Sequence, residues 1–199
     1  MDAALPISQV STQTSGKRFG IRAGAYMLDT IILNLVSYAV AFAAALPIGF
    51  VIGVANGFYG QTYVFDEEPD KIVNFLGNLV MLTLYFTLFE WLYGATPGKL
   101  VFGLRVVKED GGGCSLGSAF VRALLRFVDG LFCGLVAYAK MKAPQYQRLG
   151  DQAARTIVVG SGDPIIQRPR RVWRFLLAAG CFLTIELVYC AALIGSMVH

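Results

Sequence analysis

Three stretches of the chain are long and predominantly apolar, and polar connections separate them. They cover residues 23–55, 72–93 and 173–198. A helix needs about 20 apolar residues to cross the hydrocarbon layer of a bilayer. Each stretch therefore predicts a transmembrane helix, and the first is expected to kink at Pro47.

Small residues recur at every fourth position along the first of these helices: Ser37, Ala41, Ala45, Gly49, Gly53 and Gly57. Small side chains at this spacing share one face and let a second helix approach closely. The pattern fits a packing seam within one chain as well as it fits an interface between copies.

Residues 118–139 resemble a further span but carry charges in their first half. Arg122, Arg126 and Asp129 leave about ten uncharged residues, which are too few to cross a bilayer alone. Two glycines in that remainder are expected to break the helix. We interpret the segment as a re-entrant or interfacial helical hairpin, with four full spans as the alternative.

The distribution of Lys and Arg favours the hairpin. Basic residues gather within 17–22, 99–108 and 140–174, whereas the connection 56–71 is acidic. Basic loops tend to stay on the cytoplasmic side of a membrane, and only the hairpin places all three basic groups there. The sequence thus predicts a protein of the cell membrane, taken as a bacterial inner membrane, with its N-terminus in the cytoplasm and its C-terminus outside.

Two short β-rich runs lie between the second and the last apolar stretch. Residues 100–107 are followed by a turn signal at Glu109-Asp110-Gly111, and residues 156–159 form a matching run. We expect the two to pair on the cytoplasmic side. The predicted fold class is an all-α integral membrane protein with three transmembrane helices, the hairpin and this small β pairing.

Composition agrees with a membrane protein and narrows the function. The chain has 199 residues, of which 56% are hydrophobic and 15% charged, whereas soluble domains carry about 25% charged residues. The basic residues lie beside apolar helices, which argues against a nucleic-acid partner. No Cys/His cluster, nucleophile–base pair or dinucleotide motif occurs, so we expect no metal, no cofactor and no enzymatic activity.

Charged residues within the apolar segments are the candidate site. Arg22 and Asp29 are seven residues apart, and so are Arg122 and Asp129, with Arg126 between them. Ions in a bilayer usually pair with one another or line a pathway. Asp29 is therefore expected either to pair with Arg122 or Arg126 or to form a cation or proton site with Asp129.

Two glutamates are further candidates, outside this charged site. Glu90 adjoins Trp91, at the depth where aromatic residues gather, and is expected to be exposed there. Glu186 lies in the middle of the last apolar stretch and should face protein, where it is a possible contact with a partner chain. Lys99 is expected at the lipid surface, after a turn.

Five motifs in this order resemble the RDD family of membrane proteins, over about residues 17–160. They are Arg22…Asp29, Gly94-Ala-Thr-Pro-Gly-Lys99, Gly103-Leu-Arg-Val-Val107 followed by Asp110-Gly111, Arg122…Asp129, and Gln147-Arg-Leu-Gly-Asp151-Gln-Ala-Ala-Arg-Thr156-Ile-Val-Val159. The resemblance implies that Arg22 and Asp29 are the family's arginine and first aspartate. The second is either Asp129 or Asp151. Gly150 and Arg155 replace the usual His and Gly of the last motif.

The resemblance also suggests an organisation and a function. It divides the chain into a polar tail (1–16), an RDD-like membrane domain (17–160), a basic linker (161–172) and an additional transmembrane helix (173–199). Exchange of monovalent cations and protons has been attributed to some members, which implies ion handling as one expectation. The alternative is an accessory or scaffold subunit, and either role suits a homo-oligomer or a complex with other membrane subunits.

Overall fold

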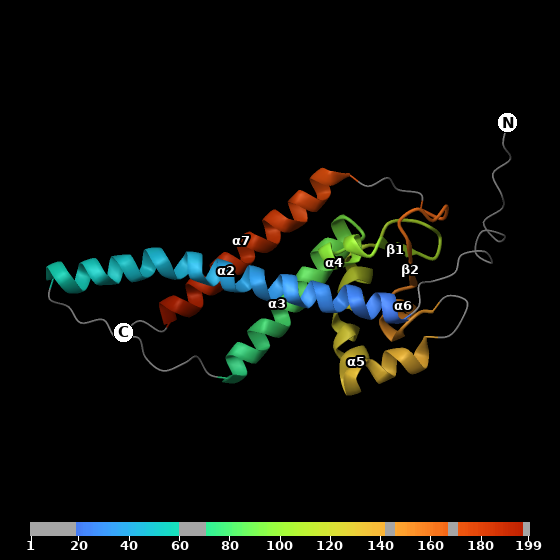
Figure 1. Cartoon of the computed structure of the whole chain (residues 1–199), viewed down its shortest axis with the longest axis horizontal. Helices are drawn as coiled ribbons and strands as arrows, with labels where there is room; N and C mark the ends of the chain where they lie inside the picture. Colours follow the sequence, from blue (N-terminus) through green and yellow to red (C-terminus); the bar gives the residue numbers. More distant parts are fainter. Residues whose placement is uncertain (1–18, 60–70, 142–145, 167–170, 197–199) are drawn as a thin grey trace.

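The computed structural model describes residues 19–59, 71–141, 146–166 and 171–196. The predicted polar tail, most of the acidic connection, part of the basic linker and the extreme C-terminus lie outside these ranges. Three described helices are long and apolar enough to cross a membrane: α2 (Phe19–Tyr59), α3 (Lys71–Leu92) and α7 (Val172–Ser196). They confirm the three predicted apolar helices. Figure 1 shows α3 and α7 crossing α2.

The three long helices pack through aromatic side chains. Tyr85, Phe86 and Phe89 of α3 form one buried cluster with Leu33 of α2 and Phe182 of α7. The ring of Tyr85 meets the ring of Phe182 edge to face, with centroids 5.3 Å apart. Such ring pairs add about 0.5–1.5 kcal/mol beyond the area they bury, so the added helix α7 is an integral part of the packing.

Helix α7 is also tied to α2 by a hydrogen bond between polar side chains. The Ser37 hydroxyl donates to Glu186 Oε1 at 2.6 Å, and Glu186 is only 3% exposed. Glu186 therefore faces protein, as predicted, and its partner belongs to the same chain. Ser37 belongs to the predicted small-residue stripe, but a Cβ added at Gly49, Gly53 or Gly57 would meet no atom of the described chain within 4 Å.

Helix α5 (Leu116–Lys140) corresponds to the predicted hairpin. It is one helix of 25 residues, with a bent course in Figure 1, and the structure gives no support for a re-entrant hairpin. The two glycines do not break it, because the helical backbone continues through both positions. Helix α5 is not among the three described helices that are apolar enough to span, and it packs against α3 and α6 (Leu149–Ala153).

The predicted β pairing is present. Strand β1 (Leu104–Lys108) pairs antiparallel with β2 (Thr156–Gly160), with Val106 opposite Val158. The sheet is buried on both faces, because alternate residues belong to two different apolar clusters. The predicted start of the first β-rich run at Leu100 was wrong. Leu100 belongs to the short helix α4 (Pro97–Val101), whose first residue is a proline.

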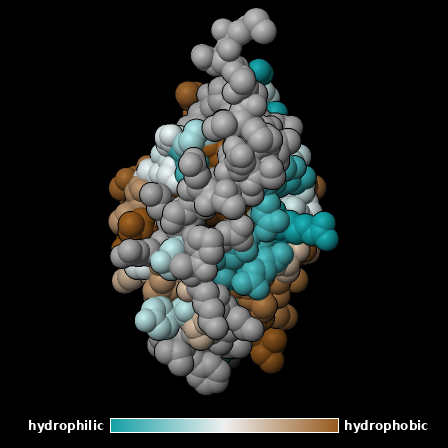
Figure 2. Space-filling view, turned by 90° about the vertical axis from the view of Figure 1, so that its right-hand side faces the viewer, coloured by the Kyte–Doolittle hydropathy of each residue, from teal (hydrophilic) through white to brown (hydrophobic). Residues whose placement is uncertain are grey.

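The sheet lies at one end of the molecule, beside the first turns of α2 (Figure 1). Seen from that end, hydrophilic residues gather between more hydrophobic flanks (Figure 2). This distribution is typical of a membrane protein whose polar end lies at the bilayer surface. It places α4, α6 and the sheet on the polar side, with the long helices extending away from them.

A position of Glu186 near the middle of the bilayer would fix the depth of the other residues. If Ser37 and Glu186 lie near the middle of the bilayer, a hydrocarbon core about 30 Å thick covers about ten residues of α2 on either side. Asp29 then lies near the edge of the core and Arg22 beyond it. Because α2 has 41 residues, its other end also extends past the hydrocarbon.

Replacing Ser37 with alanine removes the hydroxyl that Glu186 accepts from. We expect Ser37→Ala to lower the free energy of unfolding by about 1 kcal/mol, the usual scale for a hydrogen bond between membrane helices. Thr184→Ala is the matched control, because the Thr184 hydroxyl bonds only within its own helix, to the Gly180 carbonyl at 2.9 Å. Unfolding with increasing SDS in mixed micelles measures both variants, and equal losses would argue against the contact.

Candidate functional site

A cluster of buried ions lies where α2, α3, α4, α5 and α6 meet, at the polar end of the long helices. Five cations and four carboxylates contribute to it, and no side chain among them is more than 13% exposed. The members are Arg22, Asp29, Glu90, Lys99, Arg122, Arg126, Asp129, Arg148 and Asp151. Among them are all six residues that the sequence proposed as the charged site, together with three that it did not.

Glu90, near the end of α3, is the acceptor at the centre of the cluster. Lys99 Nζ and Arg126 Nη2 donate to its Oε1 at 2.8 and 2.7 Å, and Arg122 Nε donates to Oε2 at 2.8 Å. The predicted exposure of Glu90 is wrong, because the residue is fully buried. It faces α4 and α5, while the adjacent Trp91 is 40% exposed.

Arg122 of α5 joins the two centres of negative charge. Its Nε donates to Glu90 and its Nη1 donates to Asp151 and, at 2.5 Å, to the Thr156 hydroxyl. The side chain is completely buried. A lysine could not make these contacts together, because only the guanidinium presents several donors in a fixed planar arrangement.

Asp151 of α6 accepts from three arginines. Arg22 and Arg122 each form an ion pair with it, and Arg148 donates through its Nε at 3.3 Å and its backbone amide at 3.2 Å. Burial alone would raise the pKa of this carboxyl, but Arg122, Arg22 and Arg148 outweigh that effect and hold the pKa below its usual range. Asp151 is therefore an ionised anchor for α6.

Asp29 of α2 has different partners from those expected. The Tyr85 hydroxyl donates to its Oδ1 at 3.1 Å, the Gly98 amide to Oδ1 at 2.6 Å and the Thr96 hydroxyl to Oδ2 at 2.5 Å. Among the ion pairs of the described residues none includes Asp29. The expected pairing with Arg122 or Arg126 is not formed, because both arginines are bound to Glu90.

Asp129 of α5 is the least satisfied carboxylate of the cluster. It is 2% exposed, and within the described part of the chain neither of its oxygens accepts a hydrogen bond. Its nearest cation is Arg148, with 3.6 Å between Nε and Oδ2. Asp29 instead accepts from three donors of α3, α4 and the turn between them, so the two aspartates have different partners.

Arg126 connects the cluster with a cavity among the helices. Its guanidinium lies 3.5 Å from the centroid of the Phe86 ring. It also lines a cavity of about 210 Å³, together with residues such as Tyr26 of α2 and Thr83 of α3. The described residues that line this cavity include one cation and no carboxylate, so the lining favours an anion or an apolar group over a metal cation.

Lys99 links Asp29 to Glu90 through hydrogen bonds. Its Nζ donates to Glu90, and at 3.3 Å to the Thr96 hydroxyl, which in turn donates to Asp29. The expectation of a lysine at the lipid surface is wrong, since Lys99 is 7% exposed. Burial lowers the pKa of Lys99 to about 8, against the opposing attraction of Glu90.

Sequence reasoning missed Glu90, Lys99 and Arg148 as members of the cluster. The Gly94–Lys99 motif could have indicated two contacts of the cluster. Pro97 begins helix α4, from which the Gly98 amide donates to Asp29 and the Lys99 side chain donates to Glu90. Within the described residues no group of three His, Cys, Asp or Glu side chains is arranged to hold a metal ion. The site is thus a network of ion pairs and hydrogen bonds.

Three long apolar helices capped by a buried ion cluster and a two-stranded sheet define a helical protein of the membrane type. The chain belongs to the RDD family, whose family model matches residues 17–155. Comparison with curated proteins and with solved structures found no significant match. Helix α7 lies outside the matched residues, and both Asp129 and Asp151 lie within them.

Replacing Gly98 with alanine should break the contact between α2 and α4. A Cβ at Gly98 would overlap the Ala25 carbonyl oxygen and would lie 2.8 Å from Asp29 Oδ1. Such overlap with backbone forces the elements apart, and we expect a loss of about 1–3 kcal/mol in the free energy of unfolding. Gly20→Ala is the control, since its added Cβ would meet no described atom within 4 Å. Thermal unfolding in detergent checks this, and an unchanged midpoint for Gly98→Ala would contradict the geometry.

The pKa of Lys99 makes a prediction for alkaline pH. Its pKa is about 8 in the folded protein and 10.5 in the unfolded chain, so between these values the unfolded chain binds more protons. The contribution of Lys99 to stability therefore rises with pH in that window, by at most about 1.4 kcal/mol per pH unit. Urea unfolding from pH 7 to 10.5 should show this rise for the wild type and its absence for Lys99→Met. Parallel curves for the two proteins would refute it.

Proposed function

We propose that this chain is a non-enzymatic scaffold of the membrane, and that it acts as an accessory subunit of a larger membrane assembly. The observation that carries the proposal is the saturation of Glu90 and Asp151, each of which accepts from three basic residues. Fixed arginines cannot give up their protons near neutral pH. Carboxylates held in this way are suited to joining structural elements rather than to exchanging ions.

The hydrogen bonds of Asp29 support the same role. Its three donors come from α3, α4 and the turn between them, so one carboxylate of α2 holds the end of α3 and the start of α4 together. An ion-binding carboxylate needs oxygens that an arriving cation can reach. Both oxygens of Asp29 are occupied by neutral donors, and the residue is fully buried.

Handling of monovalent cations or protons is the second candidate, and two observations favour it. Asp129 is buried with neither oxygen hydrogen-bonded in the described structure. A hydrogen-bonded chain also runs from Asp29 through Thr96 and Lys99 to Glu90. On this alternative, Asp129 binds the cation and Lys99 changes its protonation state.

The orientation belongs to the same proposal. The sheet and α6 face the cytoplasm, because basic residues concentrate on that side of the chain, and the membrane is the inner membrane of a bacterium. The N-terminus is then cytoplasmic and the C-terminus outside. The bilayer and other membrane subunits, including further copies of the chain, are the proposed partners.

Reconstitution distinguishes the two functions. We expect purified protein in vesicles to carry no sodium, potassium or proton flux above empty vesicles. Protein extracted in a mild detergent should migrate as a discrete assembly larger than the 21.6 kDa monomer. Labelling of an exposed cysteine in a Gly162→Cys variant without the native cysteines reports the sidedness of the vesicles. It also reports the orientation in cells.

A flux in the wild type that disappears in Asp129→Asn would establish the ion-handling alternative and overturn the scaffold proposal. Asp110→Asn is the matched control, because it makes the same chemical change at an exposed position outside the cluster. A monodisperse monomer without flux would contradict both the assembly and the transport function.

A further inference from the structure

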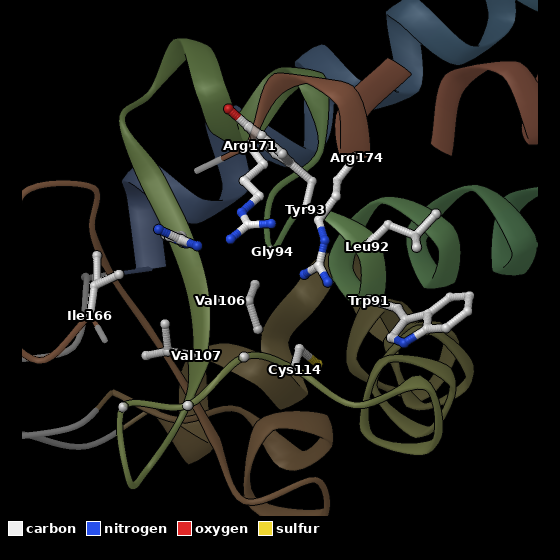
Figure 3. A pocket seen from close by; sticks show the side chains of 14 residues that line it. Trp91, Leu92, Tyr93, Gly94, Val106, Val107, Cys114, Ile166, Arg171 and Arg174 are labelled. Carbon is white, nitrogen blue, oxygen red and sulfur yellow. The ribbon is translucent and has the colours of Figure 1, made fainter. Parts of the chain in front are cut away.

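A second group of arginines lies apart from the ion cluster, around a small cavity between the end of α3, strand β1 and the start of α7. The cavity has a volume of about 30 Å³, and its lining includes Trp91, Arg105, Arg171 and Arg174. This volume is roughly two to three times what a single water requires. Figure 3 shows Arg171 and Arg174 extending side by side from the start of α7 toward Gly94.

The charges at this cavity are of one sign. Three arginines line it, and no lining residue that the structure describes is acidic. None of the ion pairs among the described residues includes Arg171 or Arg174, and Arg174 Nε is buried without a hydrogen-bond partner there. Like charges held together repel one another, and a buried donor without an acceptor is costly. Both problems are solved by an anion that accepts from several guanidinium groups.

The backbone leaves room for this arrangement at Gly94. Its φ of +81° suits glycine, and a Cβ there would lie 3.4 Å from Arg105 Nε and 3.2 Å from the Val106 carbonyl oxygen. The Val106 amide also donates to the Gly94 carbonyl at 2.7 Å. A glycine at the end of α3 therefore lets β1 approach and brings the Arg105 side chain to the cavity wall.

Two tryptophans place the cavity at the depth of the lipid headgroups. Trp91 lines it and is 40% exposed, while Trp173 is 55% exposed and lies 5.5 Å from the Arg174 guanidinium. Tryptophan gathers at the interface between hydrocarbon and water. Both residues also stand at the polar ends of long apolar helices. Basic pockets between such helices bind the headgroups of anionic lipids.

We propose that the pocket formed by Arg105, Arg171 and Arg174 binds the phosphate of an anionic phospholipid headgroup. The guanidiniums supply hydrogen bonds to the phosphate oxygens, and the tryptophans contact the adjoining glycerol and upper acyl chains. The proposal does not depend on whether the chain is a scaffold or an ion carrier. It assigns the first turn of α7, beyond the residues that the family model matches, to lipid binding.

The two tryptophans are the only ones in the chain, so their fluorescence reports on this site. Full-length protein is reconstituted in phosphatidylcholine vesicles that contain increasing fractions of phosphatidylglycerol brominated near the top of its acyl chains. Brominated phosphatidylcholine gives the reference. We expect stronger quenching by the anionic lipid, and Arg174→Gln should lower this preference about tenfold, the effect of losing one charge-assisted hydrogen bond to the phosphate.

Arg155→Gln is the matched control, because Arg155 is exposed and does not line the cavity. It removes the same charge and should leave the preference unchanged. Arg171→Gln provides a second test at an exposed position if Arg174→Gln does not fold. Equal losses in the Arg174 or Arg171 variant and in the control would show a general surface attraction and overturn the proposal.

Competition with soluble phosphate distinguishes a lipid headgroup from a free phosphate ion, because both present phosphate oxygens to the pocket. Inorganic phosphate or glycerol phosphate at millimolar concentration should not reduce the lipid preference. If the wild type shows no lipid preference, but its fluorescence changes with soluble phosphate and that change is lost in Arg174→Gln, the pocket takes a free phosphate and the lipid assignment is wrong. No response to either ligand would refute the site altogether.

Discussion

The buried guanidinium of Arg122 is the interaction on which the rest of the structure depends. It contacts Glu90 of α3 through one nitrogen and Asp151 of α6 and Thr156 of β2 through another. An isolated ion at this depth would be strongly unfavourable, and removing one partner of a buried pair typically costs about 3–5 kcal/mol. Each of the two carboxylates has further cationic partners, which stabilise the network. Lys99 and Arg126 also pair with Glu90. Arg22 and Arg148 also pair with Asp151. As a result, the membrane helices and the sheet are joined through shared ions.

The long helices could be predicted from the sequence because their signal is large and local. A run of about 20 apolar residues is typical of a helix that crosses a bilayer, and the observed helices α2, α3 and α7 coincide with the predicted apolar stretches. The pairing of β1 with β2 was also predictable, since two short β-rich runs near polar turns needed a partner. The continuous helix α5 could not be predicted in the same way. Its charges argued against a simple span, but Arg122 and Arg126 bind Glu90 of α3 and Arg122 also binds Asp151 of α6 without a hairpin, and only the folded neighbours reveal this.

The partners of the charged residues could not be read from their spacing. Arg22 and Asp29 share a helix face, yet one contacts Asp151 and the other contacts Tyr85, Thr96 and Gly98. Glu90 was expected in the headgroup region because Trp91 marks that depth. What the sequence did not show is the rotation of α3, which turns Glu90 inward and Trp91 outward. Helical neighbours differ by about 100° in direction, so adjacent residues report the same depth and different surroundings.

Depth also explains how this chain tolerates so many buried ions. The cluster lies where the first turns of α2, the end of α3 and the sheet meet. If Glu186 lies at mid-bilayer, this is the edge of the hydrocarbon, where the cost of a charge is lower. Glu186, the acidic residue placed near the middle, has a hydrogen bond to Ser37 and no ion pair with a described cation. The ion pairs of the described residues therefore lie at one end of the long helices, where the network joins them, and the arginines at the start of α7 remain available for an anion. The same electrostatic constraint applies to both groups: buried charges require partners, which the protein supplies for Glu90 and Asp151 and the bilayer supplies, on our proposal, for the arginines at the start of α7.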